Sequence, residues 1–237
     1  MRSLNIMIVA ITGTRKGIGR HLAEYFLEAG DIVIGCSRGP SELEHSNYKH
    51  CSLDVGSEDA VKSFFRDIRI EYGHLDVLIN NAGVASMNHF LLTPEASITQ
   101  IFQTNFVGTF LCSREAAKLM KKGGTGRIIN FSTIAVPLRL AGSAAYAASK
   151  SAVISLTEIA SKELSPFGIT VNAIGPTPVR TSMLRTLSKE TVDAVVSQQT
   201  IKRLGDMDDI INVVSFFISP KSSFITGQTI YLGGVFQ

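Results

Sequence analysis

The sequence predicts an α/β protein in which one doubly wound parallel sheet carries helices on both faces. Short runs rich in β-branched residues alternate with longer amphipathic segments along the whole chain, and such alternation favours parallel strand pairing. No repeat, low-complexity tract or Pro- and Ser-rich linker divides the 237 residues. Because 45% of the residues are hydrophobic, the chain can form one large hydrophobic core, and we expect a single domain over residues 1–237.

The expected strands are short runs in which Val and Ile predominate. The first of them is apolar throughout, as is typical of a strand buried on both faces. The full set comprises residues 6–11, 32–36, 77–79, 127–131, 169–173 and 229–232.

Helical periodicity fills the gaps between these strands. The first helical stretch begins at a glycine-rich turn and places Leu22, Ala23, Phe26 and Leu27 on one face. The expected helices span residues 17–29, 58–71, 98–120, 144–164 and 206–218.

Composition argues against several classes of protein. Lys and Arg number 23 and Asp and Glu 20, so the net charge is +3, and it is spread without a block of like charges. We therefore expect no nucleic-acid partner. Cys36, Cys51 and Cys112 are far apart and the five histidines are dispersed, which predicts reduced thiols and no metal site. No apolar run approaches the ~20 residues of a membrane span, and we expect a cytoplasmic protein.

A glycine-rich turn follows the first expected strand, in Thr12-Gly13-Thr14-Arg15-Lys16-Gly17-Ile18-Gly19. Glycines let the backbone approach a pyrophosphate closely, and the positive end of the following helix favours its charge. The GxxxGxG spacing lacks the Gly-Lys-Ser/Thr ending of nucleoside-triphosphate loops. We expect a dinucleotide here, bound by Gly13, Arg15, Lys16, Gly17, Ile18 and Gly19.

The end of the second strand favours NADP(H) over NAD(H). An NAD site needs a carboxylate there for the ribose 2′-hydroxyl, whereas Ser37 and Arg38, with Lys16, suit a 2′-phosphate. A solvated Arg38 at a strand end is the alternative. Asp54, followed by Val55, is expected either to accept a hydrogen bond from the adenine amino group or to cap the next helix.

Residues 177–200 are polar, carry no strand pattern and follow a strand end. Ligands bind beyond the carboxyl ends of strands in doubly wound sheets, so this segment is expected to be a mobile substrate lid. Met183, Leu184 and Leu187 within it favour a partly apolar substrate.

In this order and at these intervals, the motifs resemble those of the short-chain dehydrogenase/reductase family, which implies a Rossmann fold. The resemblance covers nearly the whole chain. Besides the glycine-rich turn it rests on Asn80-Asn81-Ala82-Gly83, Asn105, Tyr146-Ala147-Ala148-Ser149-Lys150, Asn172 to Pro176 and Ile225-Thr226-Gly227-Gln228.

Tyr146 and Lys150 are four residues apart in a helical stretch and project from one face. A nearby ammonium lowers the pKa of tyrosine, which makes the phenol a usable acid and base. The resemblance implies that Tyr146 protonates a carbonyl oxygen as NADPH delivers hydride, and that Lys150 also holds the nicotinamide ribose. It also implies that Asn105 holds a water that relays protons to Lys150. An Asn105 that bonds only neighbouring backbone is the alternative.

The family's substrate-orienting serine lies thirteen residues before the tyrosine, which is Thr133 in this chain. Threonine keeps the hydroxyl but is stiffer at χ1 and bulkier. Ser132 is the alternative if the register shifts, although one residue turns a side chain to the opposite face of the sheet.

The remaining cofactor contacts also follow from the resemblance. Asn81, Ala82 and Gly83 belong to the cofactor site in this family. Pro176, Val179 and Thr181 are expected near the nicotinamide. The family's Pro-Gly is here Pro176-Thr177, which places a branched side chain close to this ring.

Together these features predict an NADPH-dependent reductase that converts a ketone into a secondary alcohol, with 3-oxoacyl thioesters as the leading substrates. A sugar, polyol or secondary-metabolite ketone is the first alternative, and a non-catalytic NADP(H)-binding regulatory protein is the second. The resemblance further implies a homotetramer or homodimer.

Overall fold

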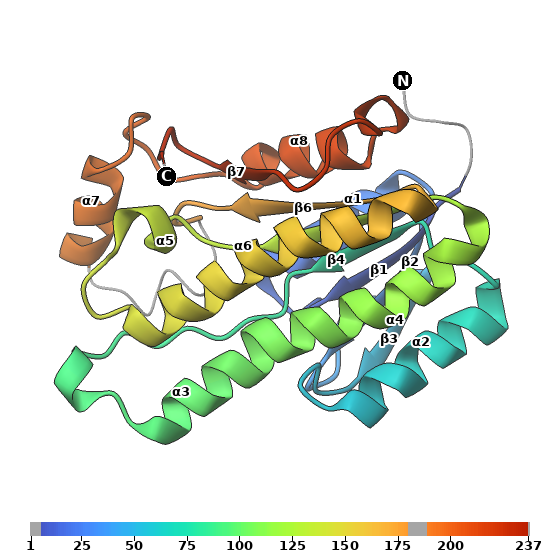
Figure 1. Ribbon diagram of the computed structural model, residues 1–237, viewed down its shortest axis with the longest axis horizontal. Coiled ribbons are helices and arrows are strands. Elements are labelled where there is room, and N and C mark those ends of the chain that lie inside the picture. Colours follow the sequence, from blue (N-terminus) through green and yellow to red (C-terminus); the bar gives the residue numbers. More distant parts are fainter. Residues whose placement is uncertain (1–5, 180–188, 237) are drawn as a thin grey trace.

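The computed structural model describes residues 6–179 and 189–236, which form one sheet between two helical layers (Figure 1). Within the described residues the sheet has seven strands in the order β3-β2-β1-β4-β5-β6-β7, and every pair is parallel. The strands are β1 (Ile8–Thr12), β2 (Ile32–Ser37), β3 (Tyr48–Ser52), β4 (Val77–Asn80), β5 (Gly126–Phe131), β6 (Ile169–Gly175) and β7 (Thr229–Tyr231). The predicted single-domain, doubly wound parallel fold is confirmed.

Six strands lie where the sequence predicts them, whereas β3 is an addition to the expected set. Its sequence, Tyr-Lys-His-Cys-Ser, lacks the Val and Ile signature of the others because it is an edge strand with only partly buried side chains. Edge strands bury one row of side chains at most, so the apolar pattern is weak there.

The five expected helices are present, one of them interrupted by a change of winding, and two further helices at 135–138 and 189–197 were not predicted. The second of these lies within the segment that was expected to be the lid. Residues 98–120, predicted as one helix, form α3, a π-helical turn (Gln103–Val107) and α4 in direct succession. The helices of four or more residues are α1 (Gly17–Glu28), α2 (Glu58–Tyr72), α3 (Glu95–Phe102), α4 (Gly108–Gly123), α5 (Ala135–Leu138), α6 (Ala144–Leu164), α7 (Lys189–Ser197) and α8 (Met207–Ile218).

Two apolar layers hold the helices on the sheet. Ile8 and Ala10 of β1 face the layer that contains α2, α4 and α6, whereas Val9 and Ile11 face α1 and α8. All four side chains are at most 5% exposed, as the continuous apolar run predicts for a strand covered on both faces.

The functional region is positioned by the strand order. Because β1 pairs with β2 on one side and with β4 on the other, the connections that leave β1 and β4 diverge at the carboxyl edge of the sheet. Doubly wound sheets bind ligands in the crevice that this divergence leaves.

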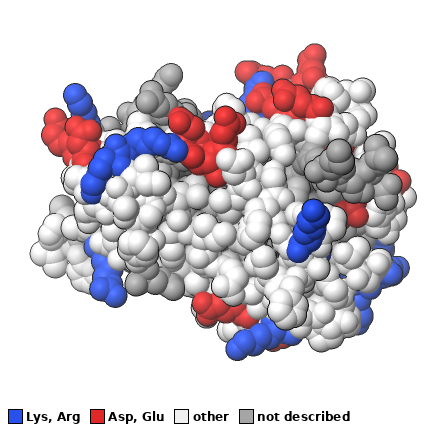
Figure 2. Space-filling model, turned by 90° about the horizontal axis from the view of Figure 1, so that it is seen from above, with Lys and Arg blue, Asp and Glu red and all other residues white. Residues whose placement is uncertain are grey.

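The surface shows no large field of one sign on the face above β7 and α8. Figure 2 shows Lys, Arg, Asp and Glu mainly around the periphery of this face, with both signs side by side. Among the described residues no helix is long and apolar enough to cross a membrane. In the same residues no group of three or more His, Cys, Asp and Glu side chains is placed to hold a metal ion.

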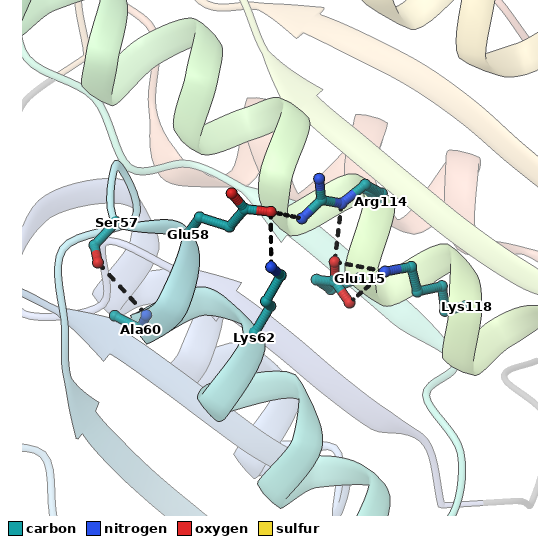
Figure 3. A network of polar contacts seen from close by, with 7 residues as sticks. All are labelled: Ser57, Glu58, Ala60, Lys62, Arg114, Glu115 and Lys118. Atoms are coloured by element: carbon teal, nitrogen blue, oxygen red, sulfur yellow. Dashed lines mark hydrogen bonds and ion pairs between the residues drawn. The ribbon is translucent and has the colours of Figure 1, made fainter.

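An ion-pair network joins α2 to α4 (Figure 3). Arg114 donates to Glu58 at 2.8 Å and to Glu115 at 2.9 Å, and Lys118 donates to both carboxylate oxygens of Glu115 at 2.8 and 2.9 Å. Lys62 contacts the same Glu58 oxygen at 3.0 Å. The Glu115 side chain is only 11% exposed, so it is the member of the network that is least screened by water.

Glu115→Gln is expected to lower the free energy of unfolding by about 1 kcal/mol at pH 7. Burial alone raises the pKa of Glu115, but Lys118 and Arg114 outweigh it and the pKa is lowered. The carboxylate therefore stabilises the fold above its unfolded pKa of about 4.3, and this contribution is lost as the pH falls through the lower folded value. Urea unfolding at pH 7 and pH 3 measures it, with Glu163→Gln on α6 as the control. An equal difference at both pH values would contradict the network's role.

Candidate active site

The loops that leave β1 and β4 are held together by Asn81. Its Nδ2 donates to the carbonyl oxygen of Thr12 at 2.9 Å and to that of Gly13 at 3.3 Å. A Cβ on Gly19 would lie 2.4 Å from Asn81 Nδ2 and 2.4 Å from the Gly13 oxygen. Gly13 itself has φ +80°. Gly19 is thus required because other atoms approach it closely, and Gly13 because its backbone is left-handed.

The amino end of α1 opens at the same place. Lys16 is the N-cap, its side chain makes no capping hydrogen bond, and the first turn carries no acidic residue. The first N–H groups of the helix, from Gly17 to Gly19, are therefore available to an anion, which the helix dipole favours. Arg15 and Lys16 are exposed beside them. These features fit a dinucleotide pyrophosphate.

The ends of β2 and β3 form the next part of the crevice. Arg38 and Asp54 line a cavity of about 500 Å³ with side chains of α3 and the π turn. Asp54 Oδ1 accepts from the backbone of Gly56 at 2.9 Å, and the N-cap of α2 is Ser57. The alternative in which Asp54 caps α2 is therefore wrong. Val55 is buried against Gly108, where a Cβ would lie 2.6 Å from Val55 Cγ2.

Gln103 is a site residue that sequence reasoning missed. Its Nε2 donates to the carbonyl oxygen of Gly56 at 2.6 Å and so clamps the turn that carries Asp54. The residue sits in the π turn, and nothing in the helical periodicity of residues 98–120 distinguishes it. The π turn, which holds one more residue than an α-helical turn, sets the direction of the Gln103 side chain.

The same π turn directs Asn105 into the core, where it is fully buried. Asn105 accepts from the backbone N–H of Val84 at 2.8 Å, and its Nδ2 contacts Val84 O at 2.9 Å and Ser149 Oγ at 3.0 Å. These partners lie on the loop after β4 and on α6, far away in the sequence. Ser149 was also missed, since its place in the Tyr146 to Lys150 motif gives no sign of this contact.

Lys150 lies on the inner face of α6 and is 3% exposed. Its Nζ donates to the carbonyl oxygen of Phe131, at the end of β5, at 2.7 Å. A Cβ on Gly83 would lie 3.5 Å from Nζ and 3.3 Å from Asn105 Oδ1, so these three residues adjoin. Burial lowers the pKa of Lys150 to about 8, because the ammonium loses hydration that one carbonyl does not replace.

The structure corrects the expectation for Tyr146. Burial raises the pKa of its phenol, and the nearby Thr133 side chain only partly opposes that rise. The predicted lowering by Lys150 does not occur, because Lys150 is turned toward Phe131 and its own pKa is depressed. In this state Tyr146 is a protonated acid.

Thr133, and not Ser132, is the hydroxyl residue beside Tyr146. Thr133 Oγ1 accepts from the backbone N–H of Ala135 at 3.2 Å, and its side chain is near enough to Tyr146 to lower the pKa of that phenol. Ser132 is 4% exposed, and its Oγ contacts the backbone oxygen of Lys150 at 3.5 Å. The two neighbours follow the end of β5 and have different partners.

Comparison with known proteins bears on these motifs. The sequence profile of a family described as "Enoyl-(Acyl carrier protein) reductase" matches residues 13–235. This chain belongs to the short-chain dehydrogenase/reductase family. It is 33% identical over 233 residues to the 3-oxoacyl-acyl-carrier-protein reductase FabG of Vibrio cholerae, covering 96% of each chain. With the FabG of Staphylococcus aureus it shares 34% identity over 234 residues, covering 94% of this chain and 95% of that one.

Solved structures of this family superpose closely. ElxO with NADP bound has a TM-score of 0.88 at 30% identity, with 96% of this chain and 97% of that chain covered. The aldohexose dehydrogenase of Thermoplasma acidophilum, in ligand-free form, has a TM-score of 0.89 at 30% identity, with 98% and 94% covered. The chain is thus an oxidoreductase of this family with an NAD(P)-type cofactor.

Thr177, a departure from the short-chain dehydrogenase/reductase pattern, is accommodated by two glycines. The Thr177 side chain is buried. A Cβ added to Gly205 would lie 2.8 Å from Thr177 Oγ1, and a Cβ added to Gly233 would lie 2.8 Å from Thr177 Cγ2. Pro176 O accepts from Ile134 N at 3.2 Å, and Val179 forms a bridge with Gly205. Thr181, like Met183, Leu184 and Leu187 of the expected lid, lies outside the described residues.

Gly205→Ala is expected to lower the free energy of unfolding by about 1–3 kcal/mol, because the new methyl group overlaps Thr177 Oγ1. In the Thr177→Ala background, Gly205→Ala is expected to lower the free energy of unfolding far less, since Thr177 Oγ1 is no longer present. A double-mutant cycle in urea measures the coupling. Gly123→Ala, where no atom lies within 4 Å of the added Cβ, is the control. Additive effects of the two substitutions would contradict this packing.

Proposed function

We propose that this protein is an NADPH-dependent carbonyl reductase. The observation that carries the proposal is the buried Lys150, whose Nζ lies 2.7 Å from the carbonyl oxygen at the end of β5, on the same helix as Tyr146, whose phenol is influenced by the nearby Thr133. Two hydroxyls that converge suit a single carbonyl oxygen, which gains negative charge and then a proton during reduction.

Cofactor binding is assigned to the glycine-rich turn and the strand ends. The pyrophosphate fits the amino end of α1, and Asn81, Ala82 and Gly83 line the approach to the nicotinamide, together with Pro176, Val179 and Thr181. Ser37 and Arg38, with Arg15 and Lys16, supply the hydroxyl and cations that a 2′-phosphate needs. A structural relative that was solved with NADP bound supports this assignment.

The proton chemistry is assigned to four residues. Thr133 orients the carbonyl, and Tyr146, whose raised pKa keeps it protonated, donates the proton to the carbonyl oxygen. NADPH, when bound, supplies the hydride. Lys150 holds the ribose, and its ammonium stabilises the phenolate that remains. Asn105 contributes by fixing Val84 and Ser149 around Lys150, and we assign to it the water that returns a proton to that lysine.

Substrate assignment rests on the relatives. The FabG proteins are 3-oxoacyl-acyl-carrier-protein reductases, so a 3-oxoacyl thioester is the leading substrate. An aldohexose dehydrogenase among the structural relatives favours a sugar or polyol as the second candidate, and a secondary-metabolite ketone remains an alternative. A non-catalytic NADP(H)-binding role is the outcome if no carbonyl is turned over.

We also propose a homotetramer or homodimer. Ile98 of α3, Phe110 of α4 and Ile159 of α6 are 40, 43 and 54% exposed. Long helices that present such side chains to water have apolar area left to bury against another copy.

Tyr146→Phe is expected to lower the turnover of an acetoacetyl thioester with NADPH about 10²–10⁴-fold, because the proton donor is lost while the ring is retained. NADPH consumption at 340 nm measures it, with Tyr72→Phe on α2 as the matched control. A crotonyl thioester run in parallel tests whether a C=C bond is reduced instead. Wild-type turnover that survives Tyr146→Phe would overturn the mechanism.

Arg38→Asp is expected to raise the KM for NADPH about 10–100-fold, as the loss of a charged hydrogen bond predicts, and to leave the KM for NADH nearly unchanged. The exposed Arg66→Asp on α2 controls for the change of charge. Equal losses with both cofactors would refute the assignment of the 2′-phosphate to Arg38.

A further inference from the structure

A polar cluster at the end of β2 is centred on a histidine to which the proposed function gives no role. His50 of β3 is at its centre, and Tyr48, Thr14, Ser37 and Gly39 surround it. His50 Nε2 lies 3.0 Å from the carbonyl oxygen of Gly39 and 3.2 Å from Ser37 Oγ. His50 Nδ1 lies 3.1 Å from the Tyr48 hydroxyl and 3.4 Å from Thr14 Oγ1.

The directions of these hydrogen bonds follow from the acceptors. The Gly39 carbonyl only accepts, so His50 carries its proton on Nε2. Tyr48 donates to Thr14 Oγ1 at 2.9 Å, which leaves the Thr14 hydroxyl proton for Nδ1. Ser37 also donates to the Gly39 oxygen, at 2.8 Å. The Gly39 oxygen thus receives two donors, one from His50 and one from Ser37.

This double contact matters because of where Gly39 lies. A Cβ on Gly39 would be 2.9 Å from Nη1 of Arg15, so the glycine-rich turn and the end of β2 meet at this residue. Ser37 and Arg38 immediately precede it. Three of the groups assigned to the 2′-phosphate therefore depend on how the Gly39 peptide is held.

The cluster also requires a glycine at position 35, against which it packs. A Cβ on Gly35 would lie 2.5 Å from Thr14 Oγ1 and 2.5 Å from the Tyr48 hydroxyl. Gly35 and His50 are paired in the β2–β3 register. The strand edge is thus shaped to admit these polar side chains, which an apolar residue at position 35 would displace.

We propose that His50 is a positioning residue that sets the preference for a 2′-phosphate, an inference that rests on the proposed NADPH site. His50 Nε2–H holds the Gly39 carbonyl. Ser37 can then release that carbonyl and turn its hydroxyl proton to the phosphate without leaving a bare acceptor behind. The held carbonyl oxygen also stays pointed away from the phosphate, whose charge it would repel.

Two amide variants separate this role from simple packing. His50→Gln places an amide near the position of Nε2, whereas His50→Asn reaches only about as far as Nδ1. Both are neutral and polar. Lys49→Gln, an exposed change on the same strand whose side chain pairs with Glu71, controls for effects on β3.

The experiment measures the Kd of NADPH, NADH and adenosine 2′,5′-bisphosphate by fluorescence and calorimetry, together with kcat and KM. His50→Asn is expected to weaken the binding of NADPH and of the bisphosphate about tenfold. This is the effect of one lost hydrogen bond to a charged group, here the bond from Ser37 to the 2′-phosphate. NADH binding is expected to change less than about twofold by the same reasoning, and kcat at saturating NADPH is expected to stay close to the wild-type value while KM rises. His50→Gln is expected to restore most of the preference.

Failures of the two proposals are distinguishable. If the wild type prefers NADPH and Arg38→Asp abolishes that preference, an unchanged NADPH/NADH ratio in His50→Asn overturns the role of His50 alone. Equal weakening of both cofactors in His50→Asn overturns it too, because that result reports a structural role. If the wild type binds NADH as tightly as NADPH, the 2′-phosphate site itself is refuted.

Discussion

The contact between Asn81 and the turn after β1 is the constraint on which the site depends. Its amide bonds Thr12 and Gly13, and Gly19 has no room for a side chain beside it. The amide thereby fixes the amino end of α1 relative to the loop after β4. The pyrophosphate site that we propose at that helix end and the nicotinamide site that we propose along that loop need this fixed separation, since geometry set before binding lowers the cost of ordering a long ligand.

The π turn at Gln103–Val107 likewise holds two separate parts of the crevice in place. One end of it clamps Gly56 through Gln103, and its centre directs Asn105 to Val84 and Ser149. Gln103 and Asn105 both belong to this π turn. A single local change of helical winding therefore supports both the adenosine end and the catalytic end of the site that we propose.

The sequence predicts most of this architecture but not its fine contacts. Apolar runs placed six strands, and the spacing of Tyr146 and Lys150 placed both on one face of α6, because those features repeat with a short period. The π turn and the roles of Gln103 and Ser149 depend on partners far away in the sequence. The pKa of Tyr146 was mispredicted for the same reason: sequence spacing shows that Lys150 is near, but not that it is turned to Phe131 and desolvated.

The all-parallel sheet has a consequence for how the chain reaches this state. Parallel neighbours cannot be joined by a tight hairpin, so every pair awaits an intervening crossover, and β1 meets β4 only after about 65 residues have intervened. Such high contact order slows folding, and it leaves apolar strands exposed in partly folded chains. The central strand β1 therefore gains its second neighbour, β4, only when residues 77–80 have followed it along the chain.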